Sequence, residues 1–319
     1  MSALDTLKEL TSIVVDSGDL SSIVQLHPED ATTNPSLILK AAAIPEYEPL
    51  INNAVQFTKE KTNSQQSQVI IACEKLAVNI GCEILKYIPG RISTEIDVRL
   101  SFNTNACIER AKRIIELYQL QGIDKSRVLI KIAATWEGIR AAEILEKEGI
   151  NCNLTLIFAF AQARACAEAN VFLISPFVGR IYDWYQKVNP VSEYDPEQDE
   201  GVKSVRAIYN YFKQHGYSTV VMGASFRKVE QVLALAGCDK LTVSPQLLQT
   251  LDKGHYSIVK HLHVPGQTHA RPSSITEADF RWQFNEDPMA VEKLAEGIRL
   301  FAEDQRKLEA MITLHLEKA

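Results

Sequence analysis

The chain has 319 residues and a formal net charge of −6 at pH 7, and 46% of its residues are hydrophobic. That fraction is sufficient for a sizeable core, and the length suits one α/β barrel with additional elements. The negative charge argues against a nucleic-acid-binding protein, because phosphate backbones require a basic surface. It does not exclude local basic pockets for small phosphates.

The six cysteines have neither CxxC spacing nor a set of histidines nearby, which indicates free thiols in a reducing compartment. The sequence shows no signal-peptide pattern and no apolar run long enough to cross a bilayer. We therefore expect a soluble, cytoplasmic protein that does not bind membranes. Walker-type, GxGxxG and HExxH motifs do not occur, so nucleotide and metal mechanisms have little support.

In the first third of the chain, short strands alternate with helices. We expect strands at 12–16 and 31–35, which place Asp16 and Asn34 at their ends. A strand at 91–98 has one wholly polar face, formed by Ser93, Glu95 and Asp97. Helices are expected at 3–10, on both sides of a polar break at 62–68 within 46–87, and at 107–118.

The stretch 127–158 places polar side chains inside two otherwise apolar strands. Read with a period of two, the first strand has Lys131 among small apolar neighbours, and the strand that follows the helix 136–147 carries Asn153 and Thr155 on one face. A strand, a helix and a strand in about thirty residues form a right-handed βαβ unit with parallel strands. Lys131 and Thr155 are therefore expected to be neighbours.

Later strands are expected to end on Ser175 and Ser225, each followed by a helical start that carries Arg180 or Arg227. Residues 261–274 lack clear periodicity. The last helix is expected to pack against the outside of the barrel or against a partner subunit. The other elements in this half are helices at 161–168, 177–188, 202–212, near 245 and from 289 onward, a surface loop at 189–201, and strands at 171–175, 219–225 and 240–244.

Eight strand candidates, mostly separated by helices, predict a (β/α)₈ TIM barrel of the α/β class. We expect a single domain over 1–319 with extra N-terminal and C-terminal helices. A barrel interior is normally filled by branched apolar side chains, so a polar interior costs stability and indicates a site. The side chains expected to point inward are Asp16, Glu95, Lys131, Asn153 and Thr155, with Asn34, Ser175 and Ser225 at strand ends.

These residue types suit carbonyl chemistry. Burial disfavours the charged form of an amine, so Lys131 is a candidate Schiff-base nucleophile. Imine formation requires proton transfers that Glu95 could supply with a water held by Thr155. Asp16, on another strand, could remove a hydroxyl proton from the substrate and so drive cleavage of a carbon–carbon bond.

A phosphate pocket is expected at the ends of the sixth and seventh strands, because helix starts offer backbone N–H groups and arginines offer guanidinium forks. Its candidate residues are Ser175, Arg180, Ser225 and Arg227.

Each interpretation has a structural alternative. Lys131 and Glu95 could form an ion pair without a catalytic role, and Asp16 and Asn34 could be turn or helix-cap residues. The arginines could lie at the surface or at a subunit contact, and the polar residues of the fifth strand could satisfy each other. Their joint placement at one end of one barrel favours a site.

Over essentially its whole length the chain resembles the transaldolase family, of the long bacterial and eukaryotic type. The matching blocks are DATTNPSLIL, GRISTEID, LIKIAATWEGIRAAEILEKEGINCNLTLIF, AFAQARACAEA, LISPFVGRI and VVMGASFR. The resemblance implies a class I aldolase-type barrel that uses no metal or organic cofactor. It also implies a role in the non-oxidative pentose phosphate pathway.

The resemblance further implies individual roles. Lys131 would form the Schiff base, Asp16 would be the acid/base for carbon–carbon cleavage, and Glu95 with Thr155 would hold the catalytic water. The substrate-binding residues so implied are Asn34 and Asn153 for hydroxyls, Arg180, Ser225 and Arg227 for the phosphate, and Ser175 as a lining residue.

The implied reaction moves a dihydroxyacetone unit from sedoheptulose 7-phosphate to glyceraldehyde 3-phosphate. It yields erythrose 4-phosphate and fructose 6-phosphate. Phe177 favours transfer, because relatives that act mainly as aldolases tend to have a tyrosine there. The alternatives are an aldolase that releases free dihydroxyacetone and a non-catalytic sugar-phosphate-binding barrel.

The sequence departs from many relatives at Ala134 and Ala159, where serine is expected. Both are expected to lie away from the substrate. A homodimer is the usual state of the family.

Overall fold

A closed barrel of eight parallel strands forms the centre of the computed structural model, which describes residues 2–318. Strands that are consecutive in the chain are neighbours in the barrel, and β8 pairs with β1 to close it. This confirms the predicted (β/α)₈ fold. The strands are β1 (Ser12–Asp16), β2 (Asp30–Thr32), β3 (Ile92–Glu95), β4 (Val128–Ala133), β5 (Cys152–Ile157), β6 (Leu173–Pro176), β7 (Val220–Gly223) and β8 (Lys240–Val243).

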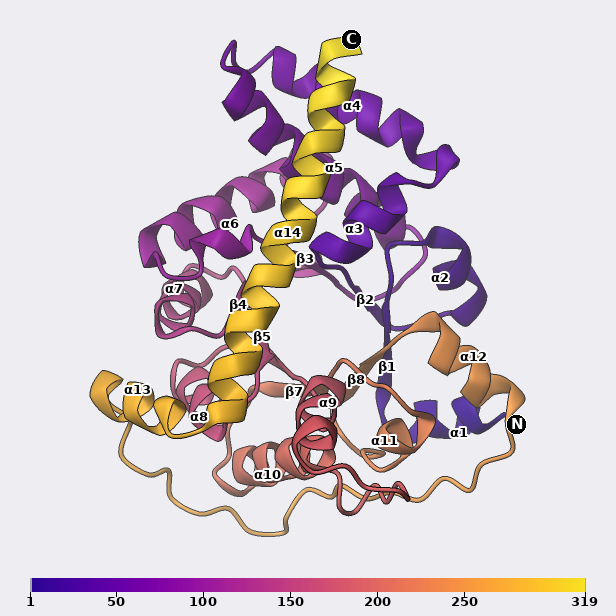
Figure 1. The fold of residues 1–319 in the computed structure, drawn as a ribbon, viewed down its shortest axis with the longest axis vertical. Helices are drawn as coiled ribbons and strands as arrows, with labels where there is room; N and C mark the ends of the chain where they lie inside the picture. The colour runs from indigo at the N-terminus through magenta and orange to yellow at the C-terminus, as the bar shows by residue number, and fades with distance from the viewer. Residues whose placement is uncertain (1, 319) are drawn as a thin grey trace.

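Helices surround the barrel, as Figure 1 shows. Many begin at residues suited to helix starts; Thr135, for example, accepts a hydrogen bond from the Gly138 N–H at 3.0 Å and so caps the helix after β4. The helices are α1 (Ala3–Leu10), α2 (Leu20–Leu26), α3 (Pro35–Ala42), α4 (Glu48–Lys59), α5 (Gln65–Leu85), α6 (Thr104–Gln119), α7 (Trp136–Lys147), α8 (Phe160–Glu168), α9 (Gly179–Val188), α10 (Glu200–Gln214), α11 (Val229–Leu233), α12 (Pro245–Lys253), α13 (Glu277–Asn285) and α14 (Pro288–Lys318), with 3₁₀ turns η1 (Pro45–Tyr47), η2 (Val98–Leu100) and η3 (Lys125–Arg127).

Several element boundaries differ from the prediction. Helices α2 and α13 were not predicted, although Asp19 and Thr276 cap their first turns. The strand predicted at 91–98 ends at Glu95, because Asp97 accepts a hydrogen bond from the Arg99 N–H and starts η2. Asp97 is therefore a cap and lies outside the strand.

The barrel interior is layered. Four apolar side chains form a floor, and polar groups occupy the middle of the barrel. A separate apolar cluster lies above them, at the carboxyl ends of the strands, and includes Phe177, Leu294 and Phe301. The floor consists of Val14, Leu129, Leu173 and Met222.

Helix α14 has two roles in the fold. It packs along α3 and α5, as expected for a helix on the outside of the barrel. It also contacts β5, η2 and α9 and crosses the front of the barrel in Figure 1. The sequence did not predict this second position, over the carboxyl ends of the strands. No helix in the described part of the chain has both the length and the hydrophobicity needed to span a bilayer.

Glu146 joins the end of α7 to the next two strands. Its carboxylate accepts hydrogen bonds from the backbone N–H groups of Cys152 at 2.8 Å and Phe172 at 2.7 Å. Burial raises the pKa of Glu146 to about 7, although the two backbone hydrogen bonds act to lower it. Between its ordinary value of 4.5 and about 7, the native chain therefore binds more protons here than the unfolded chain does.

This shift makes stability depend on pH with a defined sign. A carboxyl group with a raised native pKa contributes its stability at low pH and loses it as the pH rises through the native pKa. The free energy of unfolding of the wild-type chain should therefore fall between about pH 4.5 and 7. We expect Glu146→Gln to make this fall smaller by about 1 kcal/mol. The expected change is smaller than the full pKa shift would give, because the side chain is partly exposed and solvent screens its charge. Urea denaturation across that window measures it, with Glu143→Gln on the same helix as the control. An unchanged pH slope in Glu146→Gln would contradict the assignment.

Candidate active site

Lys131 lies inside the barrel, on β4. Its side chain is 6% exposed, and its Nζ lies 3.1 Å from Oε2 of Glu95, whose side chain is 2% exposed. The amine also donates a hydrogen bond to the carbonyl oxygen of Thr33 at 3.2 Å. The parallel register explains the pairing, since Lys131 is level with Glu95 on β3 and Asn153 on β5. The structural alternative of an ion pair is thus present in the geometry.

Glu95 is paired by charge but incompletely hydrogen-bonded. Neither carboxylate oxygen accepts a well-directed hydrogen bond from a described residue, although Oε2 is within ion-pair distance of Lys131. Burial raises the pKa of Glu95, and the nearby Lys131 opposes this. A buried carboxyl group with free lone pairs is suited to exchanging protons with a water or a substrate.

Thr155 is the clearest unsatisfied group in the interior. It is fully buried on β5, two residue pairs beyond Lys131 in the register, and its Oγ1 has no hydrogen-bond partner among the described residues. A buried hydroxyl without a partner costs free energy. Asn153, two residues earlier, does not satisfy it: the Asn153 amide donates to Ser93 at 3.1 Å and accepts from Ser175 at 2.6 Å. The alternative that Asn153 and Thr155 bond each other is therefore wrong.

Three neighbouring strands, β8, β1 and β2, contribute a carboxylate and two hydroxyls. Thr32 donates to Oδ1 of Asp16 at 2.8 Å and shares a 2.7 Å hydrogen bond with Thr242. Asn34 caps α3 through a 2.9 Å hydrogen bond from the Leu37 N–H, as the structural alternative held. Asn34 nevertheless lines the same cavity as Asp16.

A cationic pair lies where α9 meets the loop after β7. The two segments approach closely because Gly179 has no side chain: a Cβ there would lie 2.2 Å from the Ser225 carbonyl oxygen, which accepts a hydrogen bond from the Gly179 N–H at 2.6 Å. This contact brings Arg180, in the first turn of α9, next to Ser225 and Arg227. Ser225 has a φ of 59°, a conformation that a non-glycine residue rarely adopts.

The two arginines differ in their partners. Arg227 donates to Asp183 from Nε at 3.0 Å and from Nη2 at 2.8 Å. Arg180 Nη1 is buried without a partner among the described residues. Burial lowers the pKa of Arg180, and repulsion from Arg227 adds to the shift. The prediction that Arg227 lies in a helical start is wrong, because α11 begins at Val229 after extended backbone at Lys228.

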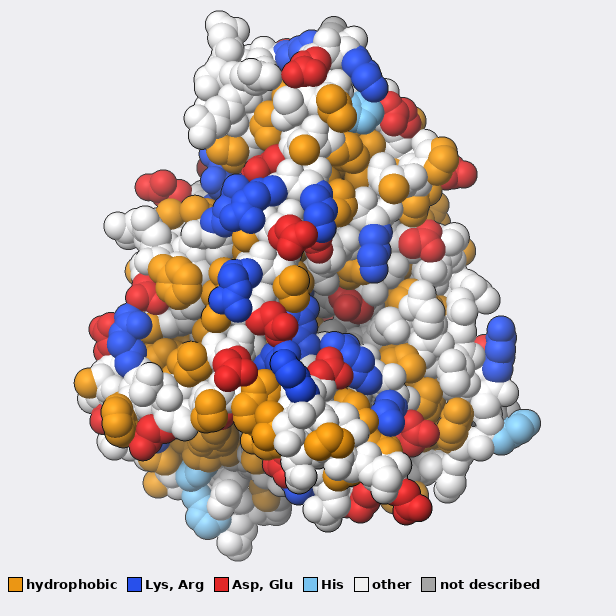
Figure 2. Space-filling model, viewed as in Figure 1, with side chains coloured by type: hydrophobic (Ala, Val, Ile, Leu, Met, Phe, Trp, Pro, Cys, Tyr) orange, Lys and Arg blue, Asp and Glu red, His pale blue; other side chains and the backbone are white. Residues whose placement is uncertain are grey.

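These groups meet in one cavity of about 190 Å³ at the carboxyl ends of the strands. Figure 2 shows a hollow beside α14 on this face, with Lys and Arg side chains on its rim. Nine of the predicted residues line the cavity, while Glu95 and Asn153 reach it through their contacts with Lys131 and Ser175. The nine are Asp16, Asn34, Lys131, Thr155, Ser175, Phe177, Arg180, Ser225 and Arg227.

Some residues that line the cavity were not predicted from the sequence. Thr242 and Ser244 alternate with Leu241 and Val243 in and after β8, so the period of two contained a signal for them. Phe301 also lines the cavity, but it comes from α14, and no local pattern indicates that this helix crosses the barrel.

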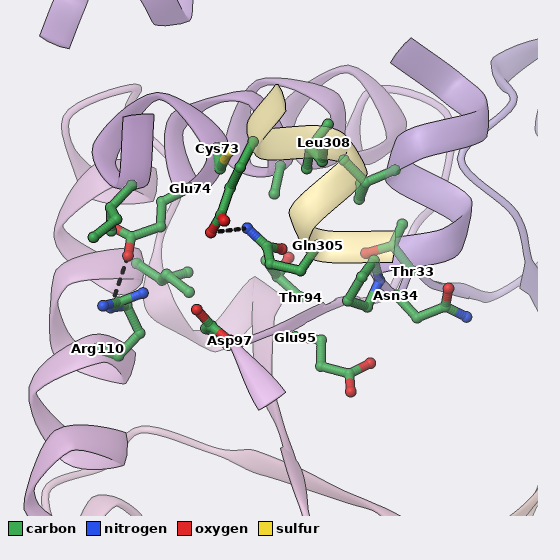
Figure 3. A pocket seen from close by; sticks show the side chains of 16 residues that line it. Thr33, Asn34, Cys73, Glu74, Thr94, Glu95, Asp97, Arg110, Gln305 and Leu308 are labelled. Carbon is green, nitrogen blue, oxygen red and sulfur yellow. Dashed lines mark hydrogen bonds and ion pairs between the residues drawn. The ribbon is translucent and has the colours of Figure 1, made fainter. Parts of the chain in front are cut away.

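A second cavity, of about 40 Å³, lies behind Glu95 between β3, α5 and α14 (Figure 3). Its charged groups already have partners, such as Glu74 with Arg110 at 2.7 Å. The Glu95 carboxylate points away from that pair in Figure 3. We therefore place the chemistry in the larger cavity.

Comparison with known proteins agrees with this site. The model of the family described as Transaldolase/Fructose-6-phosphate aldolase matches residues 13–312. The chain is 61% identical to Transaldolase A of Escherichia coli K12 over 316 residues, which cover 99% of this chain and all of that protein. Transaldolase A of Shigella flexneri and Transaldolase 2 of Salmonella paratyphi A are 60% and 61% identical over the same coverage. The chain belongs to the transaldolase/fructose-6-phosphate aldolase family. The resemblance predicted from the sequence is confirmed.

Ala134 and Ala159, the positions at which the resemblance leads us to expect serine, do not line the cavity. Ala159 stands at the start of α8 without a side-chain cap. Gln162, which is fully buried, holds the surrounding backbone instead: Oε1 accepts from the Phe158 and Ala159 N–H groups, and Nε2 donates to the carbonyl oxygens of Ala134 and Leu156, all at 2.9 to 3.0 Å. Gln162 thus holds the ends of β4 and β5 in place in this member of the transaldolase family, and no sequence pattern indicated this role.

Because the Thr155 hydroxyl has no partner among the described residues, its removal should reduce activity but not stability. We expect Thr155→Val to leave the free energy of unfolding unchanged or raise it by up to about 1 kcal/mol, because it removes an unsatisfied buried hydroxyl. Transaldolase activity should fall by about a hundredfold. Thr94→Val is the matched control: the Thr94 hydroxyl shares a 2.6 Å hydrogen bond with Tyr118, so its loss should cost about 1–3 kcal/mol. Equal destabilisation by both variants would contradict our interpretation of Thr155.

Proposed function

We propose that the chain catalyses the transaldolase reaction through a Schiff base on Lys131. The observation that carries the proposal is the buried amine, 3.1 Å from Glu95 and in the same cavity as the unpaired Thr155 hydroxyl. Membership of the family supports the reaction class. The donor is sedoheptulose 7-phosphate and the acceptor glyceraldehyde 3-phosphate, and the products are erythrose 4-phosphate and fructose 6-phosphate.

The first step is attack of the Lys131 amine on the ketone carbon of the donor. The carbinolamine must gain a proton on oxygen before it loses water and becomes the imine. Glu95 supplies and recovers this proton through a water held by the Thr155 hydroxyl. The free lone pairs of Glu95 and the missing partner of Thr155 suit these roles.

Asp16 then removes the proton of the hydroxyl group on the fourth carbon. The bond between the third and fourth carbons breaks and the aldehyde product leaves. The electron pair of that bond passes into the protonated imine, so the three-carbon fragment stays on Lys131 as an enamine. The enamine attacks the acceptor aldehyde, Asp16 returns the proton, and water hydrolyses the new imine. Thr32, which donates to Asp16 at 2.8 Å, holds this carboxylate in place.

Hydroxyl and phosphate groups of the substrate have separate binding residues. Asn153 and Asn34 bind the hydroxyls of the three-carbon fragment, and Ser175 orients Asn153 through the 2.6 Å hydrogen bond.

The phosphate binds between two arginines, Arg180 and Arg227, together with Ser225. The buried unpaired Nη1 of Arg180 supports this assignment. Arg227 would exchange part of its contact with Asp183 for the phosphate.

Phe177 favours transfer of the dihydroxyacetone unit to an acceptor over its release as free dihydroxyacetone. Its apolar ring is buried at the cavity and offers no hydroxyl to position a water that would protonate the enamine. An aldolase that releases dihydroxyacetone is the second candidate function, since the matching family includes fructose-6-phosphate aldolases.

We also infer a single domain over 1–319, a homodimer and a cytoplasmic location. The chemistry needs no metal or organic cofactor, because the protonated imine formed on Lys131 accepts the electron pair. Light scattering of the purified chain tests the dimer.

Lys131→Ala tests the proposed reaction. Acceptor-dependent formation of erythrose 4-phosphate should fall by roughly a thousandfold or more, because no other group replaces the amine. Circular dichroism must show that the variant is folded. Lys147→Ala, which removes an exposed lysine paired with Glu143, is the control and should keep full activity.

Two results would count against the proposal. Retained turnover in folded Lys131→Ala would favour the non-catalytic ion pair. Free dihydroxyacetone formed by the wild-type chain faster than the transfer product would favour the aldolase.

A further inference from the structure

The last helix, α14, contacts the cationic end of the cavity with one face. Phe301 lines the cavity, and Gly297, one turn earlier, lies on the same face of the helix. Both are buried, whereas Leu300 between them is 45% exposed. Figure 1 shows α14 crossing the front of the barrel near α9, which carries Arg180.

Arg180 is held between two aromatic rings from different parts of the chain. Its guanidinium carbon lies 5.2 Å from the ring centre of Phe177, after β6, and 5.3 Å from the ring centre of Phe301. Both distances are within the range of a cation–π contact. The two rings therefore restrict the guanidinium group without occupying its N–H donors.

Gly297 allows the helix backbone to approach the same side chain. A Cβ at this position would lie 2.8 Å from Leu156 Cδ2 and 3.3 Å from Arg180 Nη1. Glycine is unfavourable in a helix interior compared with alanine. Close contact with Arg180 and Leu156 gives a physical reason for a glycine here.

Arg227 and Arg180 are held in place by different kinds of contact. Arg227 is 40% exposed and is held by the carboxylate of Asp183, which an incoming anion must compete with. Arg180 Nη1 instead has no hydrogen-bond partner among the described residues. The Arg180 side chain lines the cavity, and no carboxylate of the described residues forms an ion pair with it that a ligand would have to displace.

We propose that Phe301 and Gly297 are positioning residues that set the Arg180 guanidinium for the substrate phosphate. The phosphate as ligand rests on the proposed function, while the role of α14 does not follow from it. Changes on this face of α14 should therefore affect phosphorylated substrates selectively and leave the lysine chemistry unchanged.

The test compares two acceptors in the full-length enzyme with saturating sedoheptulose 7-phosphate. We expect Phe301→Leu to raise the KM for glyceraldehyde 3-phosphate by about fivefold to thirtyfold. The KM for unphosphorylated glyceraldehyde should change by less than about twofold. Gly297→Ala should act in the same direction and provides a second variant should Phe301→Leu fail to fold. Leu300→Ala is the matched control on the exposed face and should change neither KM.

A double-mutant cycle separates positioning from general damage to the fold. In an Arg180→Met background, Phe301→Leu should no longer change the KM for the phosphorylated acceptor. Equal increases in both KM values, or full additivity with Arg180→Met, would overturn the inference. A wild-type chain that transfers to neither acceptor would refute the proposed function instead.

Discussion

The pairing of Lys131 with Glu95 inside the barrel is the interaction on which the site depends. Two charged groups with nearly fully buried side chains are held 3.1 Å apart above an apolar floor. Removing one member of such a pair typically costs about 3–5 kcal/mol, because the other charge is left unpaired and desolvated. The pair is nevertheless incompletely hydrogen-bonded at Glu95. A purely structural ion pair would be expected to satisfy these atoms, so the free acceptor positions favour a chemical role.

The layers of the barrel make this arrangement possible. Apolar side chains below Lys131 exclude water from one side, and the cluster under α14 reduces the opening on the other. Between them, Asn153 connects Ser93 and Ser175 in a chain of buried hydrogen bonds. Low polarity around the pair strengthens every remaining electrostatic interaction. Helix α14, which covers the cavity, also contacts Arg180 through Phe301 and Gly297. The helix and the proposed phosphate-binding arginine are therefore in direct contact.

Much of the interior could be predicted from the sequence, because parallel strands in a barrel have a strict period of two. In β4 and β5 this period placed Lys131 and Thr155 on the inner face, and the observed register aligns Glu95, Lys131 and Asn153. The period failed at Asp97, where a cap competes with the strand. Helix α2 was not predicted because its seven residues, about two turns, give little periodicity, although Asp19 marks its start. The contact of Phe301 with Arg180 joins residues far apart in the chain, and only the tertiary fold brings them together.

The central claim is that the amine buried beside Glu95 bonds covalently to a ketose. The most direct measurement is borohydride reduction of the chain in the presence of fructose 6-phosphate, followed by mass spectrometry of its peptides. Our account predicts a reduced sugar-derived fragment on the peptide that contains Lys131 and on no other lysine. A fragment attached elsewhere, or the absence of any adduct in an enzyme that carries out transfer, would contradict it.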